Sequence, residues 1–128
     1  MKKVLQTNKA PQAIGPYSQG VIRHGFVFLS GQIALTPDGE SHTDKDIREQ
    51  TKLILDNIGH LLQAAGSSYG DVIKTTVFLT DMNDFSAVNE IYGAYFKLDP
   101  PARSCIAVSA LPKGAAVEIE CIAHAVNG

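Results

Sequence analysis

The sequence predicts one α/β (α+β) domain over residues 1–128, in which a mixed sheet carries two helices on one face. The 128 residues are enough for one hydrophobic core and too few for two. Two segments have the 3.6-residue apolar period of helices, and six shorter stretches are rich in β-branched and aromatic residues. Because each helical segment stands between strands, two helices on one face of a mixed sheet form the simplest assembly.

The first three strands are expected before any helix, at Lys3–Gln6, Ser18–Arg23 and Phe26–Leu35. The dipeptide His24-Gly25 between the second and third strands predicts a tight hairpin. Gly31 lies inside the third strand, where a glycine indicates a bulge or a close approach of another group to the backbone.

The first helix is expected over Asp46–Ala65. Its apolar residues follow the helical period: Ile47, Ile54, Leu55, Ile58, Leu61, Leu62 and Ala65. Thr43 or Asp44 is predicted to cap its start, because short polar side chains can accept hydrogen bonds from the free N–H groups of the first turn. Gly66 follows the helix at the position where a left-handed residue commonly ends it.

The second helix is expected over Asp84–Phe96, with Asn83 or Asp84 as its cap. Its apolar stripe consists of Phe85, Val88, Tyr92, Tyr95 and Phe96. The pair Pro100-Pro101 prevents any extension of the helix, because proline lacks the N–H that the helix requires.

The remaining strands are expected at Val72–Thr80, Ser104–Ala110 and Ala116–Ala125, which gives the order β-β-β-α-β-α-β-β. Several of these strands are apolar on both faces: Phe78 alternates with Val77 and Leu79, for example. Two helices can cover only one face of the sheet. The other face therefore needs a cover, and a second copy of the chain is the simplest one.

Composition excludes several classes of function. A net charge of −2, with 11 scattered Lys and Arg residues, argues against nucleic acid as a partner. No apolar run approaches the roughly 18 residues that span a membrane, and no apolar segment follows Met1-Lys2-Lys3 as a secretory signal would require. Two distant cysteines suit a reducing compartment, so we expect a cytoplasmic protein.

The common cofactor motifs are missing from the sequence. It has no glycine-rich phosphate loop, no nucleophile elbow and no Cys-x-x-Cys pair. The four histidines are isolated from one another, with no neighbour at a spacing typical of metal ligands. We therefore do not expect a metal enzyme.

Arg103 is the most unusual residue of the predicted strands, because it begins an otherwise apolar segment. Burying a guanidinium group is costly unless the group is paired. Its planar fork of N–H groups suits a carboxylate, and the two-residue period places Arg103 and Cys105 on the same side of the strand. The alternative is an edge-strand arginine that pairs with a surface acid.

Glu118 and Glu120 share one face of the last strand, opposite Val117, Ile119 and Cys121. Either carboxyl group is a candidate general acid or base if burial or a neighbouring charge shifts its pKa. The alternative is two hydrated acids on an exposed strand face.

Three further residues are candidates with a structural alternative. Cys105 is a candidate nucleophile or a small core residue. Tyr17 follows Gly15-Pro16 and could cover a pocket or anchor its loop. Asn89 borders the apolar stripe of the second helix and could bind a substrate or be a hydrogen-bonded boundary amide.

Several motifs occur in a fixed order along essentially the whole chain: AIGPYSQG at 13–20, LSGQI at 29–33, VIKTTVFL at 72–79, PARSC at 101–105 and VEIE at 117–120. In this combination the sequence resembles the RidA (YjgF-type, reactive intermediate deaminase) family. The resemblance implies a chorismate-mutase-like fold. It also implies a homotrimer with a central β-barrel and ligand clefts between subunits.

The resemblance further implies an activity, which is the cofactor-free hydrolysis of 2-imino acids such as 2-iminobutanoate and 2-iminopropanoate to 2-oxo acids and ammonia. Arg103 matches the family's carboxylate-binding arginine and Glu118 matches its catalytic acid. The positions that line the same cleft are matched by Tyr17, Ser30, Asn89 and Cys105.

A second hypothesis is a protein on the same trimeric scaffold that binds small carboxylates, such as 2-oxo acids, without turnover. Both hypotheses require Arg103, and only catalysis requires Glu118. An RNA-cleaving or chaperone role is also described in this family, and the acidic composition makes RNA cleavage the weakest of these alternatives.

Overall fold

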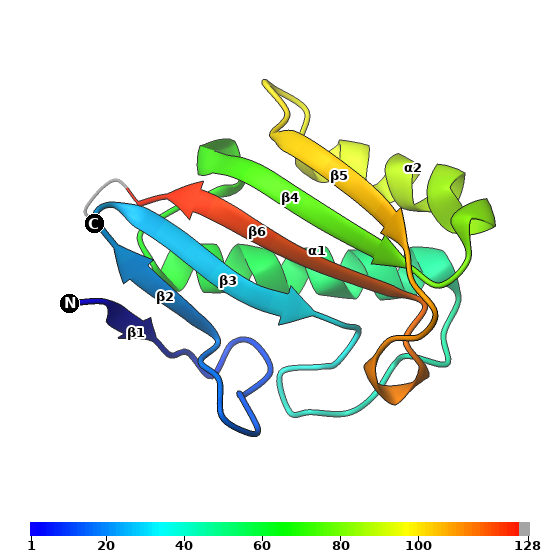
Figure 1. The fold of residues 1–128 in the computed structure, drawn as a ribbon, viewed down its shortest axis with the longest axis horizontal. Coiled ribbons are helices and arrows are strands. Elements are labelled where there is room, and N and C mark those ends of the chain that lie inside the picture. Colours follow the sequence, from blue (N-terminus) through cyan, green and yellow to red (C-terminus); the bar gives the residue numbers. More distant parts are fainter. Residues whose placement is uncertain (126–128) are drawn as a thin grey trace.

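The computed structural model describes residues 1–125 and contains a six-stranded mixed sheet with two helices behind it (Figure 1). The strands are β1 (Lys3–Leu5), β2 (Gly20–Arg23), β3 (Phe26–Gln32), β4 (Val72–Leu79), β5 (Ala102–Ala107) and β6 (Val117–His124). They lie in the order β1-β2-β3-β6-β4-β5, with β4 and β5 parallel and the other pairs antiparallel. The predicted fold class and element order are confirmed, and residues 126–128 of the predicted domain lie outside the described part.

The β2–β3 hairpin turns at His24 and Gly25, as predicted. Both residues have positive φ angles, 52° and 80°, as a two-residue hairpin loop of this hand requires. The register of β3 against β6 shifts between Leu29 and Gln32, so the bulge predicted at Gly31 is also present. The third strand ends at Gln32 and not at Leu35, because the chain leaves the sheet after this bulge.

Helix α1 (Ile47–Ala64) begins one residue after its cap, which is Asp46. The Asp46 side chain accepts a hydrogen bond of 3.0 Å from the backbone N–H of Glu49. The prediction of Thr43 or Asp44 as the cap is therefore wrong: Asp46 occupies the position whose oxygen reaches the first turn. Gly66 has φ 75° and ends the helix as expected.

Helix α2 (Phe85–Tyr95) follows a short 3₁₀ turn, η2 (Met82–Asp84). Asp84 occupies the cap position but its side chain makes no capping bond, so the predicted cap is only positionally correct. Asp81 accepts a hydrogen bond of 2.9 Å from the N–H of Asn83 and so caps the 3₁₀ turn. The carbonyl oxygen of Met82 in this turn accepts a hydrogen bond from the N–H of Phe85, the first residue of α2.

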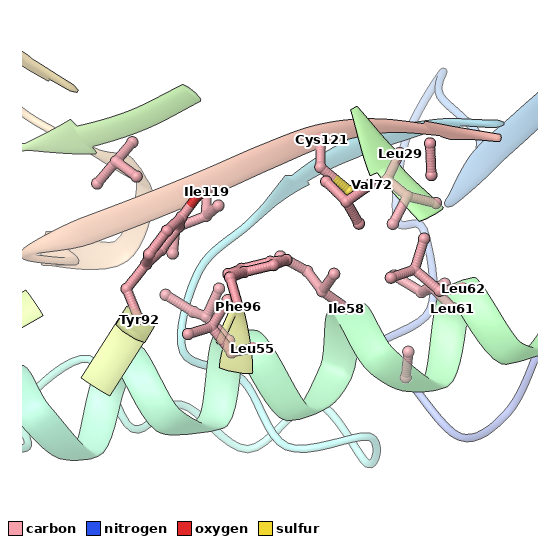
Figure 2. Close-up of a cluster of buried hydrophobic side chains, with 14 of the residues drawn as sticks. Leu29, Leu55, Ile58, Leu61, Leu62, Val72, Tyr92, Phe96, Ile119 and Cys121 are labelled. Atoms are coloured by element: carbon pink, nitrogen blue, oxygen red, sulfur yellow. The ribbon is translucent and has the colours of Figure 1, made fainter. Parts of the chain in front are cut away.

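The core lies between the sheet and α1 (Figure 2). Leu55, Ile58 and Leu61 of α1 are at most 1% exposed, and they face the buried side of the sheet. Full burial of each such side chain contributes about 1.5–3 kcal/mol. Tyr92 and Phe96 of α2 extend the same core, which confirms that both helices lie on one face.

The opposite face of the sheet has no helix over it and carries large apolar side chains. Phe28 of β3 is 44% exposed and Ile106 of β5 is 46% exposed.

β5 covers Ala102–Ala107 instead of the predicted Ser104–Ala110, because the strand beside it, β4, ends at Leu79 opposite Ala107. The other strand ends lie within two residues of prediction. No helix in residues 1–125 is long and apolar enough to cross a membrane.

Candidate functional site

Arg103 lies on β5 at the edge of the sheet and points to the side covered by α2. It pairs in register with Thr75 of β4, whose side chain is buried beneath the helix. Nη1 of Arg103 donates a hydrogen bond of 2.6 Å to Oδ1 of Asn89. The guanidinium carbon lies 4.8 Å from the ring centroid of Tyr92 and 5.4 Å from that of Phe85. Two aromatic rings and one amide thus hold this cation.

A hollow of about 640 Å³ opens beside the guanidinium group. Its lining combines apolar, polar and cationic groups from η2, α2 and β5: Met82, Asn83, Phe85, Ser86, Arg103 and Cys105. Within residues 1–125, Arg103 makes no ion pair, so its charge is not neutralised by any of the described carboxylates. This hollow can therefore receive a small anion.

Cys105 lines the same hollow, two residues after Arg103 on the same side of β5. Partial burial raises the pKa of its thiol, and the nearby Arg103 lowers the pKa by a smaller amount. The thiol form is therefore favoured, whereas a nucleophilic cysteine requires a depressed pKa.

Glu118 lies on β6 and points to the face of the sheet that no helix covers. Its neighbours Val117 and Ile119 are fully buried on the other face, so the predicted alternation of this strand is confirmed. Glu118 is half-buried, and burial, with a smaller contribution from the negative charge of Glu120, raises its pKa. The carboxylate packs on the backbone of Gly31, where any Cβ atom would overlap with it. The predicted close approach at Gly31 is therefore also present.

A second hollow, of about 500 Å³, lies beside Glu118. Its lining includes Tyr17, Ser30, Gly31 and Lys113. Tyr17 is 53% exposed. The Ser30 hydroxyl donates a hydrogen bond of 2.5 Å to the carbonyl oxygen of Ser18 and so ties β3 to the loop that carries Tyr17.

The buried side chain of Gln19 holds this loop through hydrogen bonds to the backbone of the preceding segment. It is 4% exposed, its Oε1 accepts from the N–H of Thr7 at 2.8 Å, and its Nε2 donates to the carbonyl oxygen of Pro11 at 2.8 Å. A buried amide with all its partners in the backbone gives the loop one conformation.

Within residues 1–125, no three His, Cys, Asp or Glu side chains cluster as metal ligands would.

Comparison with known proteins adds a family to this geometry. The family model described as Endoribonuclease L-PSP matches residues 7–125. A RutC family protein of Synechocystis is 50% identical over 123 residues, which cover 94% of this chain and 95% of the relative. The human 2-iminobutanoate/2-iminopropanoate deaminase is 47% identical over 123 residues, 96% of this chain and 90% of the relative. The solved structure of E. coli TdcF with bound serine has 47% identity and a TM-score of 0.90, and the match covers 95% of this chain and 98% of that one.

The chain belongs to the Rid family. Relatives in this family carry different names, among them deaminase, RutC protein and endoribonuclease. Family membership and fold are therefore established together, and the activity of this member requires its own argument.

The structure of this Rid protein divides the predicted site residues into two groups. Arg103, Asn89 and Cys105 lie together on the helix side of the sheet. The second group, Tyr17, Ser30 and Glu118, lines the hollow on the other side. Arg103 and Glu118 are on opposite faces of the sheet, so the two groups do not come together within a single chain.

Sequence patterns do not reveal several residues that surround Arg103 or line the two hollows. Phe85 and Tyr92 were assigned to the apolar core only, although their spacing of seven residues, with Asn89 between them, places all three on one side of α2. Lys113 lines the second hollow from a turn in which it has φ 57°. The proline before it and the glycine after it were the only sequence signals of that turn.

Proposed function

We propose that this protein is a hydrolytic deaminase that converts 2-imino acids, such as 2-iminobutanoate and 2-iminopropanoate, to 2-oxo acids and ammonia. The observation that carries the proposal is the Arg103 guanidinium, which lies beside a hollow and is held by neutral groups, with no carboxylate among residues 1–125 to neutralise it. The human relative named 2-iminobutanoate/2-iminopropanoate deaminase supports the substrate class.

In the proposed reaction, Arg103 binds the carboxylate of the substrate and fixes the position of the imine carbon. This carbon is electrophilic once its nitrogen is protonated, so the reaction needs no cofactor. A water oxygen bonds to the carbon while Glu118 accepts one of the water protons. Glu118 then returns this proton to the nitrogen, the carbon–nitrogen bond breaks, and ammonia leaves. The hydroxyl group gives its proton back to Glu118 as it becomes the oxo group, and Glu118 releases this proton to solvent.

The remaining predicted residues take supporting roles in this proposal. Tyr17 and Ser30 line the hollow beside Glu118, where the attacking water would bind. Cys105 lines the carboxylate side as an uncharged thiol and forms no bond to the substrate. Asn89 contributes through its hydrogen bond to Arg103.

The proposed assembly is a homotrimer in which each site combines Arg103 of one subunit with Glu118 of its neighbour. Two features support it. Arg103 is on an edge strand, from which it can reach a neighbouring subunit. The face that carries Glu118 is otherwise an exposed apolar surface, which soluble monomers rarely keep. The two free thiols, Cys105 and Cys121, suit a reducing compartment, and we propose the cytoplasm.

A non-catalytic role in binding small carboxylates is the second candidate. The structure of E. coli TdcF with bound serine favours it, because an amino acid that is no 2-imino acid occupies a protein of this fold. Such a role would use Arg103 in the same way and would leave Glu118 without a task.

The decisive experiment generates 2-iminobutanoate in place with a threonine dehydratase and follows its decay with semicarbazide as competitor. Wild-type protein is expected to accelerate the decay. Arg103→Ala removes the guanidinium that binds the substrate carboxylate, a loss of about 2–5 kcal/mol, so kcat/KM is expected to fall by about 30-fold or more. Arg48→Ala, which removes an exposed ion pair with Glu90, is the control and retains the wild-type rate.

The same assay separates the two candidates. If wild-type protein leaves the decay unchanged but binds 2-oxobutanoate in calorimetry, the protein is a carboxylate-binding protein. If Arg103→Ala keeps its activity, Arg103 does not anchor the substrate.

A further inference from the structure

Three side chains on one side of α2, those of Phe85, Asn89 and Tyr92, form the surface against which the Arg103 guanidinium rests. They recur at intervals of four and three residues, which is the spacing that aligns side chains along a helix. Each contributes a different contact to the guanidinium: one hydrogen bond of 2.6 Å and two ring faces at 5.4 and 4.8 Å.

Tyr92 is itself fixed by the strand next to Arg103. It is 6% exposed, and its hydroxyl shares a hydrogen bond of 2.7 Å with the hydroxyl of Thr75. Thr75 is also the residue that pairs with Arg103 in the β4–β5 register. The ring below the guanidinium is thus tied to the backbone position beside it. Rotation of the Arg103 side chain would therefore have to break its contacts with α2, one of which is to a ring that β4 holds in place.

Every group in this arrangement is electrically neutral. An amide oxygen and two ring faces attract a cation without cancelling its charge, whereas a carboxylate at the same place would form an ion pair with it. The arginine is therefore both fixed in direction and left fully charged. Within residues 1–125, Nη1 is the only guanidinium nitrogen that donates a hydrogen bond, so the rest of the donor fork remains for a ligand.

We propose that Phe85, Asn89 and Tyr92 act as a neutral clamp that positions Arg103 and preserves its charge for the carboxylate of the substrate. This inference rests on the proposed function for the identity of the anion. It also changes the role of Asn89, which the family resemblance places among the residues that line the substrate cleft. Asn89 is a positioning residue, because its oxygen is used by Arg103.

The sharpest test is Asn89→Asp, which keeps the shape of the side chain and adds one negative charge. Arg103 then forms an ion pair within the subunit, and the dissociation constant for 2-oxobutanoate is expected to rise at least about tenfold. KM for the imine is expected to rise with it, and kcat is expected to change less. Ala94→Asp adds the same charge to an exposed position of α2 and is expected to leave both constants unchanged.

A second measurement does not depend on any ligand. The order parameter of the Arg103 Nε–H group reports the mobility of the guanidinium, and the clamp predicts a value near the roughly 0.85 of rigid groups. Asn89→Ala and Tyr92→Leu each remove one contact and are expected to lower it, whereas Tyr92→Phe keeps the ring face and lowers it less. Thermal unfolding of each variant establishes that the fold is retained.

The two proposals fail in different ways. If the wild-type protein does not accelerate imine decay, the proposed deaminase activity is wrong. A lower Arg103 order parameter in Asn89→Ala than in wild type would still support the clamp. If the order parameter is the same in wild type, Asn89→Ala and Tyr92→Leu, or if folded Asn89→Asp binds 2-oxobutanoate as tightly as wild type, the clamp is overturned.

Discussion

At the scale of single residues, the surroundings of Glu118 make its carboxylate a stronger base than that of a hydrated glutamate. A fully hydrated glutamate has a pKa of about 4.3 and is a weak base. Here partial burial raises the pKa of Glu118, and the negative charge of Glu120, two residues along the same face, raises it further. A raised pKa makes the Glu118 carboxylate a stronger base. It also lowers the fraction of Glu118 that is ionised at acidic pH, and the pH dependence of the activity reports this fraction.

We expect the activity of wild-type protein to fall as the pH falls through the raised pKa of Glu118, because protonated Glu118 cannot accept a proton from water. Glu120→Gln removes a negative charge that raises this pKa. The pKa of Glu118 is then lower, and the acidic limb of the kcat/KM profile moves to lower pH. The measurement is kcat/KM against pH for both proteins in one buffer series.

Glu90→Gln is the matched control, because it removes a glutamate charge on α2 that pairs with Arg48 on the helical side of the molecule. Its acidic limb is expected to coincide with that of wild type. An acidic limb that stays in place in Glu120→Gln would contradict the assignment of this limb to Glu118.

At the scale of secondary structure elements, each helix contains one glycine, and the two are expected to respond to alanine in opposite ways. Nothing lies within 4 Å of a Cβ built at Gly93 of α2, so Gly93→Ala is expected to stabilise the fold by about 0.5–1 kcal/mol. A Cβ at Gly59 of α1 overlaps with the Tyr69 hydroxyl, which donates a hydrogen bond of 2.6 Å to the carbonyl oxygen of Leu55. Gly59→Ala is expected to cost about 1–3 kcal/mol.

Denaturant unfolding at one fixed protein concentration checks both signs, because the stability of an oligomer depends on concentration. Tyr69→Phe combined with Gly59→Ala gives the internal control. Without the hydroxyl group, the alanine at 59 has less to displace, so its cost is expected to shrink. An equal cost in both backgrounds would mean that the Tyr69 hydroxyl is not the obstacle.

How far the sequence predicts these elements depends on whether the signal is local. The apolar period of α1 predicts its ends to within one residue, because the residues that a helix buries recur with the helical period in its own segment. Its cap was predicted wrongly, since Thr43, Asp44 and Asp46 are equally able to cap and only the path of the chain selects one. The end of β5 also depends on another element, because its partner β4 ends at Leu79.

The same distinction applies to the candidate site. The alternation of β6 predicts correctly that Glu118 and Glu120 share a face. The hydrogen bond between Arg103 and Asn89 joins residues fourteen apart on different elements, and no local pattern specifies it. The placement of Arg103 and Glu118 on opposite faces follows from strand order and register, which sequence patterns alone leave open.

At the scale of the whole molecule, the two hollows are incomplete for the proposed reaction within one subunit. The hollow at Arg103 offers a cation without the general base, and the hollow at Glu118 offers the base without the arginine. The strand register places Phe28 and Ile106, both exposed, on the Glu118 side of the sheet. Figure 1 shows that both helices lie behind the opposite side. Burial of the Glu118 side against a neighbour would both stabilise the assembly and bring the second half of a site to the first.

A site shared between subunits can be tested by mixing two inactive proteins. Arg103→Ala subunits keep Glu118, and Glu118→Gln subunits keep Arg103, so random trimers made by co-expression contain interfaces with both intact groups. In a ring of three equivalent interfaces, equal mixing restores about a quarter of the sites, and about a quarter of wild-type activity is expected. Wild type mixed equally with the Arg103→Ala, Glu118→Gln double variant also keeps about a quarter if sites are shared, but about half if each subunit is self-sufficient. Activity of the first mixture no higher than that of its parents, together with half-activity of the second, would place the whole site within one subunit.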